Sequence, residues 1–410
     1  MTANAQVGRP MPSAAGPAAR YVVFAVWLLA AIVGGYAIAQ RLLLGERLTA
    51  YSSYIPWGLW VSAYVFFIGL SAGAFLLSSL VYVFRLRQFE PIGPLALFVA
   101  VVTLAMALLS ILFDLGHMER FWEVYLRPQW HSMMAWMVWL YTAYFVLLVA
   151  ELAVALRRRS PGRSPGQLQR YDRVLLVLGS VGVPLAVAFH GGVGALFATV
   201  VARGYWNTAI FPILFLSGAL LSGSGLLTAI VVFVWPRRDG AWRKLVADLA
   251  RIVVGLILLE LLLEFAELSI PAWYQVGPES SLIGYVLFGP YWYVFWIVYG
   301  LFGVAVPLVL LTRRDTFVRG IGAALVALTF LAVRLDLVIP GLVAPELRGL
   351  ERAYLDPVGG RLTYVYSPSL FEWQVTLGVV ALGAAVFYLG RRFLPLMTGA
   401  GEVEPRETAR

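Results

Sequence analysis

Long runs of apolar residues, separated by short polar segments, recur along the whole chain. A helix needs about 20 apolar residues to cross the roughly 30 Å hydrocarbon core of a bilayer. The runs that meet this length are residues 21–40, 54–84, 93–115, 133–156, 174–201, 210–235, 252–271, 282–311, 321–340 and 370–390. The pattern predicts an all-α polytopic membrane protein with about ten transmembrane helices.

Two of these runs carry similar motifs of small residues. Residues 69–74 read GLSAGA and residues 217–225 read SGALLSGSG, and the two runs are four helices apart and point in the same direction. This spacing is expected if each run begins one of two parallel four-helix bundles, with further helices flanking them. Alternatively, the small residues only allow membrane helices to approach closely.

The composition fits a membrane protein and no ordinary soluble one. Apolar residues make up 61% of the 410 residues and charged residues 13%, whereas about a quarter of a soluble domain is charged. A net charge of +9 would suggest nucleic acid as the partner of a soluble protein. Here the basic residues lie in short loops between apolar runs, so we expect contact with the bilayer and none with nucleic acid.

The distribution of basic residues predicts the orientation. Of the 31 Lys and Arg, 22 lie in the N-terminal tail, the C-terminal tail and every second loop, and 8 lie in the alternate loops. Cytoplasmic loops carry the excess of positive charge. The chain is therefore expected to be a multi-pass protein of the cell (inner) membrane with both termini in the cytoplasm.

The expected organisation is one membrane domain, residues 20–395, between two polar tails. The tails, residues 1–19 and 396–410, are expected to be disordered and cytoplasmic. The small residues at 37–39 resemble a signal-peptide cleavage site. However, the first apolar run of about 19 residues is longer than a usual signal core, so a transmembrane helix is favoured.

Cysteine is absent and histidine is scarce, which limits the redox chemistry of the chain. Without cysteine the chain cannot hold an iron–sulfur cluster or attach a c-type haem. Of His117, His131 and His190, only His190 lies within a predicted span, so a bis-histidine haem is not expected. His190 is either a packing residue or a group that changes protonation near neutral pH.

One predicted span contains several carboxylates, which are costly in hydrocarbon. Glu260, Glu264 and Glu267 are separated by steps of four and three residues, which places them on one helical face. At least one is expected to be neutral or paired with a cation, and span 321–340 supplies Arg334, with Asp336 two residues later. The group is either a buried ion-pair cluster that fixes packing or a proton relay or part of a quinone site.

The connection between the third and fourth spans, residues 113–136, mixes aromatic and charged side chains. This composition is typical of a segment at the membrane surface. It either anchors the helix ends as an aromatic belt or forms a docking surface for another subunit. In the second case Asp114 and Arg120 are expected to pair within it.

Several blocks of this sequence together resemble those of a known family. The blocks are Asp114-Leu115-Gly116, Arg120-Phe121-Trp122, Ser132–Trp136, Trp57–Trp60, Trp206-Asn207, Pro212, Phe215–Ser217 and Ser222-Gly223. They cover spans two to six and resemble the NrfD/PsrC-like polysulfide reductase membrane subunits. The length of ten spans is similar to that of the hydrogenase-2-type and sulfur-metabolism members.

The resemblance implies a membrane subunit that itself carries no haem and no iron–sulfur cluster. Such a subunit binds a quinone, either menaquinone or ubiquinone, and exchanges electrons with an extracytoplasmic iron–sulfur subunit. That partner is commonly connected to a molybdopterin catalytic subunit. Whether this chain is itself quinone-reactive or non-catalytic stays open at this point.

The resemblance also implies where the site lies. The quinone is expected near the outer face at the start of span 54–84, with Tyr54, Trp57 and His190 as binding residues. Arg120, Trp122 and Arg127 are expected to contact the partner subunit.

Quinol oxidation releases two electrons and two protons, so a quinol site needs two proton acceptors. His190 is the candidate for one, and Asp114, Glu264 or Glu267 for the other. Two other classes of protein remain possible. In a secondary transporter, Glu260 and Arg334 would form an ion or substrate site, and in a purely structural anchor the chain would only hold a periplasmic enzyme to the membrane.

Overall fold

The computed structural model describes residues 17–236, 238–274, 278–345 and 362–397. Their regular backbone is helical throughout, and these residues contain no β-strand. Nine helices in the described ranges are long and apolar enough to cross a membrane. The prediction of an all-α polytopic membrane protein is confirmed. The predicted tails, 1–19 and 396–410, lie almost wholly outside the described residues.

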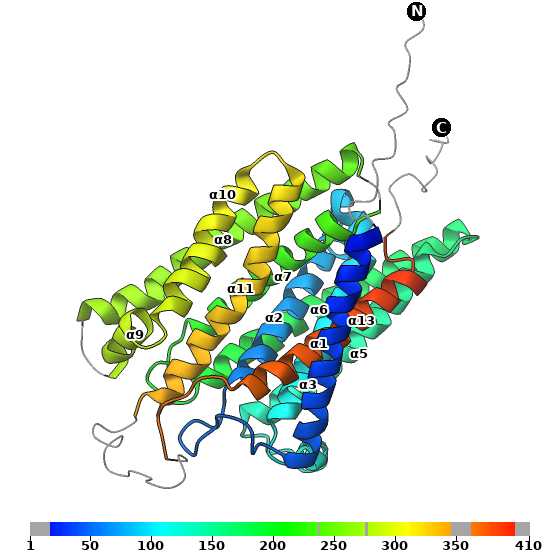
Figure 1. Ribbon diagram of the computed structural model, residues 1–410. Coiled ribbons are helices and arrows are strands. Elements are labelled where there is room, and N and C mark those ends of the chain that lie inside the picture. The colour runs from blue at the N-terminus through cyan, green and yellow to red at the C-terminus, as the bar shows by residue number, and fades with distance from the viewer. Residues whose placement is uncertain (1–16, 237, 275–277, 346–361, 398–410) are drawn as a thin grey trace, which may run out of the picture.

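The long helices form two bundles of four (Figure 1). The first bundle contains α2 (Leu59–Tyr82), α3 (Gly93–Asp114), α5 (Met133–Arg159) and α6 (Pro165–Ala198). The second contains α7 (Phe211–Val234), α8 (Gly240–Tyr274), α11 (Thr316–Val343) and a segment made of η3 (Val294–Ala305) and α10 (Val306–Thr312). The flanking helices α1 (Pro17–Leu44) and α13 (Leu370–Phe393) pack against each other, and α13 also packs against α3. The shorter elements are η1 (Arg87–Ile92), η2 (Met118–Arg120), α4 (Glu123–Leu126) and α9 (Pro278–Phe288).

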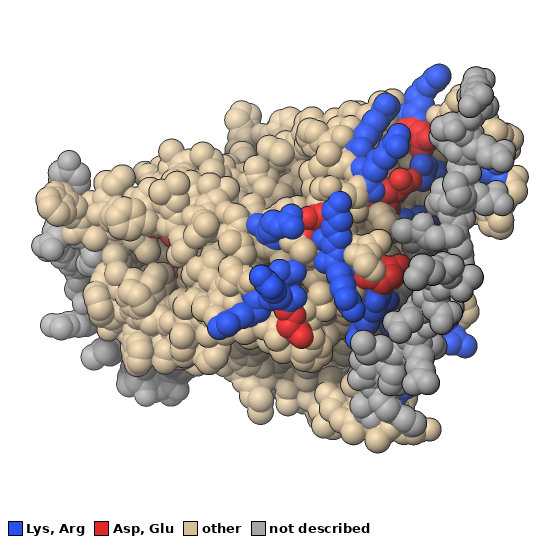
Figure 2. Space-filling view, turned by 90° about the horizontal axis from the view of Figure 1, so that it is seen from above, with Lys and Arg blue, Asp and Glu red and all other residues tan. Residues whose placement is uncertain are grey.

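The bundles have two chemically different ends. We call the end at which α1 ends and α2 begins the distal end, and the opposite end the proximal end. Figure 2 looks down on the proximal end and shows Lys and Arg side chains gathered over it. The loops that sequence reasoning placed in the cytoplasm therefore lie together at one end of the molecule.

The two small-residue motifs lie on α2 and α7, where the two bundles meet. A Cβ atom on Gly73 would lie 1.9 Å from the carbonyl oxygen of Ala219, and one on Gly223 would lie 2.6 Å from the backbone nitrogen of Ala74. Neither position has room for a side chain. The small residues bring the backbones of α2 and α7 into direct contact, as in other closely packed membrane helices.

Two predicted spans differ from the structure in detail. The single span expected over 282–311 is wrong, because α9 ends at Phe288 and η3 begins at Val294. Gly289 and Pro290 lie between them, and Pro290 has no backbone N–H to donate to the preceding helical turn. The span expected over 252–271 lies within the longer α8, which contains three glutamates and is not among the nine helices counted above.

Candidate functional site

His190 of α6 is fully buried in the distal half of the first bundle, where it contacts α7. Its Nε2 lies 2.8 Å from the carbonyl oxygen of Phe215, and its Nδ1 has no hydrogen-bond partner among the described residues. Because a carbonyl only accepts, Nε2 must carry the proton, and this assignment leaves Nδ1 of the neutral ring with a free lone pair. His190 is thus a buried acceptor without a donor.

Arg334 of α11 also contacts Phe215 and is 2% exposed. Its guanidinium carbon is 4.6 Å from the ring centre of Phe215 and 4.9 Å from that of Phe330. Within the described ranges, neither Nε nor Nη2 has a hydrogen-bond partner. The cation expected to pair with the α8 carboxylates lies over two aromatic rings and within electrostatic range of Glu260 and Glu264.

Each of the three α8 carboxylates accepts a hydrogen bond from a hydroxyl of a different segment. The hydroxyl of Ser217 on α7 donates to Glu260 over 2.5 Å. That of Tyr299 on η3 donates to Glu264 over 2.6 Å, and that of Thr208 before α7 donates to Glu267 over 3.1 Å. The carboxylates therefore bind α8 to its neighbours through hydroxyl groups, which the spacing of the glutamates could not reveal.

The distal half of α11 is fixed by the segment between α6 and α7. The hydroxyl of Tyr205 donates to the backbone oxygen of Asp336 over 3.1 Å. The indole of Trp206 donates to the backbone oxygen of Leu337 over 2.8 Å. The side chain of Asp336 is 8% exposed, and its Oδ2 has no partner in the described part of the chain. Asp336 and Arg334 are therefore both held by backbone and ring contacts, leaving polar side-chain atoms unused.

Asp114 belongs to a second polar group, at the distal end of the first bundle. The hydroxyl of Tyr51 donates to Asp114 over 2.7 Å. Burial and, after it, the neighbouring Asp114 carboxylate raise the pKa of Tyr51 well above its usual value, so this hydroxyl remains a donor at neutral pH. The expected pairing of Asp114 with Arg120 is wrong, because Arg120 binds Glu123 in its own segment through Nε and Nη2, over 2.7 and 3.0 Å.

Arg41, which sequence reasoning missed, holds the same region together. It is 1% exposed, and it donates to the carbonyl oxygens of Phe113 and Leu115, both over 2.8 Å. Its guanidinium also lies 5.5 Å from the ring centre of Trp60. These contacts join the end of α1 to the end of α3 beside Asp114.

Glu372 at the start of α13 was also missed. It is fully buried and accepts hydrogen bonds from the backbone nitrogen of Ala50 over 2.8 Å, from Ser369 and from the hydroxyl of Tyr366. Tyr366 in turn accepts from the backbone nitrogen of Leu59, over 2.8 Å. Ser369 and Glu372 form a capping box, and the Ser-x-x-Glu spacing is the sequence signal that could have revealed it.

The two aromatic residues expected to bind quinone lie near the start of α2 and are half-buried. Tyr54 stacks on Tyr364 with ring centres 4.4 Å apart. Trp57 stacks on Trp206 at 5.9 Å and meets Phe197 edge-on at 6.1 Å. Trp57 therefore contacts the segment that fixes α11, whereas Tyr54 packs on the chain ahead of α13.

The segment expected to dock a partner is exposed at the distal end. Arg120 and Trp122 are exposed, and the Arg120 guanidinium holds the pKa of Glu123 below its usual range. Arg127 is also exposed, with no ion pair to any described residue. Among the described residues no group of three or more His, Cys, Asp or Glu could hold a metal ion.

Comparison with known proteins gives consistent matches over most of the chain. A family model described as "Polysulphide reductase, NrfD" matches residues 47–346. The chain is 36% identical to a selenate reductase subunit of Mesobacillus selenatarsenatis, over 93% of this chain and 95% of that protein. It is 30% identical to the Hdr-like menaquinol oxidoreductase integral membrane subunit of Archaeoglobus fulgidus, over 91% of this chain and 93% of that protein. It is 23% identical to the menaquinone reductase integral membrane subunit of Nitratidesulfovibrio vulgaris, over 93% of both.

Proposed function

Because the chain belongs to the NrfD polysulphide reductase family, we propose that it is the quinone-reactive membrane subunit of a respiratory oxidoreductase complex. It exchanges electrons between the membrane quinone pool and an extracytoplasmic iron–sulfur subunit, which connects to a molybdopterin catalytic subunit. Relatives named as a menaquinol oxidoreductase subunit and a menaquinone reductase subunit support quinone as the redox partner, and menaquinone as its type.

The observation that carries the proposal is a pair of residues with unused polar atoms, His190 and Arg334, which both contact Phe215. Buried polar atoms are nearly always hydrogen-bonded, yet Nδ1 of His190 and two guanidinium nitrogens of Arg334 have no partner in the described residues. A quinol hydroxyl needs an acceptor and a quinone carbonyl needs a donor. The imidazole of His190 supplies the acceptor and the guanidinium of Arg334 supplies the donor, so these residues fit a quinone headgroup.

A bound quinone supplies two-electron, two-proton redox chemistry, and the protein provides the acceptors for the protons. His190 accepts one proton at Nδ1, which leaves the Nε2–H bond to Phe215 intact. The second acceptor is Asp114, Glu264 or Glu267. Each already accepts a hydroxyl hydrogen bond, from Tyr51, Tyr299 or Thr208. Tyr54 and Trp57 form the aromatic wall at the start of α2.

The proposed orientation follows from the charge on the proximal end (Figure 2). In this orientation the proximal end lies on the cytoplasmic side of the cell membrane, and the distal end lies on the outer side. Electrons then pass to the partner across the distal face, where Arg120, Trp122 and Arg127 are exposed.

The test is the activity of His190 variants in the assembled complex. His190→Gln keeps some hydrogen bonding but cannot take up a proton, so it should abolish quinol-linked turnover, as should His190→Ala. An artificial donor that feeds the catalytic partner directly should still support activity. His131→Gln, the same change at an exposed distal histidine, should leave both activities unchanged. Near-normal quinol activity of His190→Gln would instead make His190 a packing residue and move the proton chemistry to Asp114 or the glutamates.

Two observations favour a second candidate, a secondary transporter. The break between α9 and η3 and the buried charge of Arg334 are features that transporters also use. The quinone content of the purified protein separates the two functions. A stoichiometric quinone supports the redox subunit, whereas a transporter or a structural anchor should contain none.

A further inference from the structure

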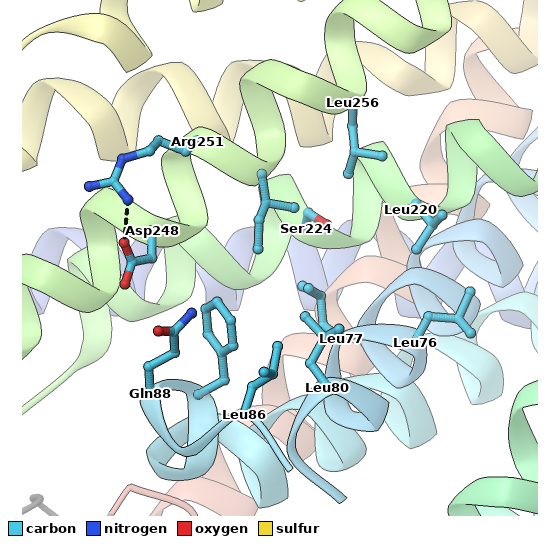
Figure 3. A pocket seen from close by; sticks show the side chains of 12 residues that line it. Leu76, Leu77, Leu80, Leu86, Gln88, Leu220, Ser224, Asp248, Arg251 and Leu256 are labelled. Carbon is cyan, nitrogen blue, oxygen red and sulfur yellow. Dashed lines mark hydrogen bonds and ion pairs between the residues drawn. The ribbon is translucent and has the colours of Figure 1, made fainter. Parts of the chain in front are cut away.

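A large cavity lies on the proximal side of the residues described so far, and its lining residues are shown in Figure 3. It has a volume of about 510 Å³ and lies between α2, η1, α7 and α8. Its wall is mainly leucine, contributed by Leu77 and Leu80 of α2, Leu220 of α7 and Leu256 of α8. The volume is within the usual range of small-molecule sites, about 300–1,000 Å³.

The polar groups of the cavity gather at one end. In Figure 3, Gln88, Asp248 and Arg251 lie on one side, and Leu220 and Leu256 lie on the other. Leu256 follows Arg251 by five residues on α8, which places it about 7.5 Å further toward the distal end. The cavity thus runs from a polar mouth at the proximal end along leucines of α2, α7 and α8 that are mostly half-buried.

Arg251 at the mouth has unused hydrogen-bonding capacity. Its Nη1 donates to Asp248 over 2.6 Å, and no other described residue binds it. The Arg251 side chain is 74% exposed, while that of Asp248 is 11% exposed. The guanidinium therefore faces outward, and the carboxylate that partly neutralises it lies behind.

A second cavity of about 230 Å³ adjoins the mouth and shares Gln88 and Asp248 with it. Arg87 and Lys244 line this second cavity, together with Trp235 and Trp242. Tryptophan is enriched at the level of lipid headgroups. Asp239, the other carboxylate of this cavity, caps the backbone nitrogen of Trp242 over 2.8 Å. The mouth therefore presents more free cations than free carboxylates.

Ser224 of α7 is the one polar side chain of the leucine-lined part of the cavity, among its described lining residues. It is fully buried, and its hydroxyl has no hydrogen-bond partner in the described part of the chain. A buried hydroxyl without a partner is unusual. A ligand oxygen at this depth would satisfy it.

We propose that this cavity is a binding site for an anionic phospholipid. One acyl chain occupies the leucine-lined part, an ester oxygen accepts from Ser224, and the phosphate lies at the mouth between Arg251, Lys244 and Arg87. The cavity has the polarity profile of such a lipid, because its walls are apolar and its mouth is cationic. Basic sites between helices at the cytoplasmic side of membrane proteins recognise anionic headgroups in this way.

The experiment measures lipid binding to the purified full-length chain by native mass spectrometry. The protein is stripped of lipid in detergent and titrated with phosphatidylglycerol or phosphatidylcholine of identical acyl chains. The wild-type protein should bind phosphatidylglycerol several-fold more tightly. Arg251→Gln should weaken the binding of phosphatidylglycerol about fivefold, because one basic residue contributes about this much at an anionic interface. The same variant should leave the binding of phosphatidylcholine unchanged. Arg391→Gln, at an exposed arginine of α13 outside the cavity, should change neither.

A second pair of variants tests the apolar part of the site. Leu256→Trp fills the cavity and should weaken the binding of both lipids, whereas Leu262→Trp, at a 64% exposed leucine of the same helix, should not. Equal binding of the two lipids by the wild-type protein overturns the proposal, as does an Arg251→Gln variant that behaves like Arg391→Gln. A quinone in place of a lipid, released specifically by Leu256→Trp, also overturns it.

Discussion

Two buried arginines of this protein differ in how fully their guanidinium groups are hydrogen-bonded. Arg41 donates to Phe113, Leu115 and Glu46, so its burial is compensated by hydrogen bonds. Arg334 lies between two rings with unused donors. Burying a charge without such bonds is costly. Under the proposed function, the unused donors of Arg334 are available to a bound quinone.

The two arginines should respond differently to the same substitution. Arg41→Met removes three donated hydrogen bonds and should destabilise the protein by about 3 kcal/mol. Arg334→Met should leave the midpoint of thermal unfolding in detergent unchanged or higher, while quinol-linked activity falls. Equal losses of stability in both variants would mean that Arg334 has a structural role.

Tyr51 and Asp114 form a pair that can be tested by a double-mutant cycle. Tyr51→Phe removes the donor, and Asp114→Asn removes the charge that the hydroxyl stabilises. The coupling energy in a denaturant titration should be about 1–3 kcal/mol, as for a buried bond to a charged group. If the two substitutions are additive, the bond does not contribute to stability.

At the scale of elements, the contact between α2 and α7 determines how the two bundles meet. Gly73 and Gly223 lie against backbone atoms of the opposite helix, so even a methyl group forces these helices apart. In contrast, Gly255 of α8 has no heavy atom within 4 Å of its Cβ position. The same substitution therefore has different consequences at the two kinds of position.

Gly73→Ala should be strongly destabilising, by about 2–3 kcal/mol, since backbone cannot move aside as a flexible side chain can. Gly255→Ala should be neutral or stabilising by up to about 1 kcal/mol, because alanine favours the helical backbone. Thermal unfolding of both variants in the same detergent gives the comparison. A Gly73→Ala protein as stable as Gly255→Ala would show that α2 and α7 do not pack this closely.

At the scale of the whole molecule, the proximal end is basic and the distal end carries an exposed aromatic segment. The difference predicts a topology that reporter fusions can measure. Fusions after Arg163 should report the cytoplasm, and fusions after Gln129 should report the outside. A cytoplasmic signal at Gln129 would place the docking segment on the wrong side of the membrane for an extracytoplasmic partner.

The docking segment itself can be tested by reversing one charge. Arg127 is exposed and forms no ion pair with any described residue, whereas Arg120 is already bound to Glu123. Arg127→Glu should therefore reduce co-purification of the iron–sulfur partner several-fold without changing membrane insertion. The control is Arg391→Glu, the same reversal at the proximal end. Unchanged co-purification in the Arg127 variant would leave the segment as an aromatic belt only.

The sequence by itself determined the helical class, nearly all the spans and the end at which the positive charge gathers. These features depend on the cost of moving each residue into hydrocarbon, which is a property of the residue and its neighbours along the chain. The motif blocks likewise identified the family, and the family model and the relatives confirm it. The break after α9 at Gly289-Pro290 could not be read from proline alone, because Pro184, Pro271 and Pro340 lie inside helices.

Only the tertiary structure decided which groups meet. It paired Asp114 with Tyr51 instead of Arg120, gave each α8 glutamate its own hydroxyl, and placed Arg334 between Phe215 and Phe330. These pairings depend on how each helix is rotated about its axis and how closely it approaches its neighbours, and hydropathy contains neither quantity. The free lone pair of His190 and the unused donors of Arg334 emerge from that packing alone.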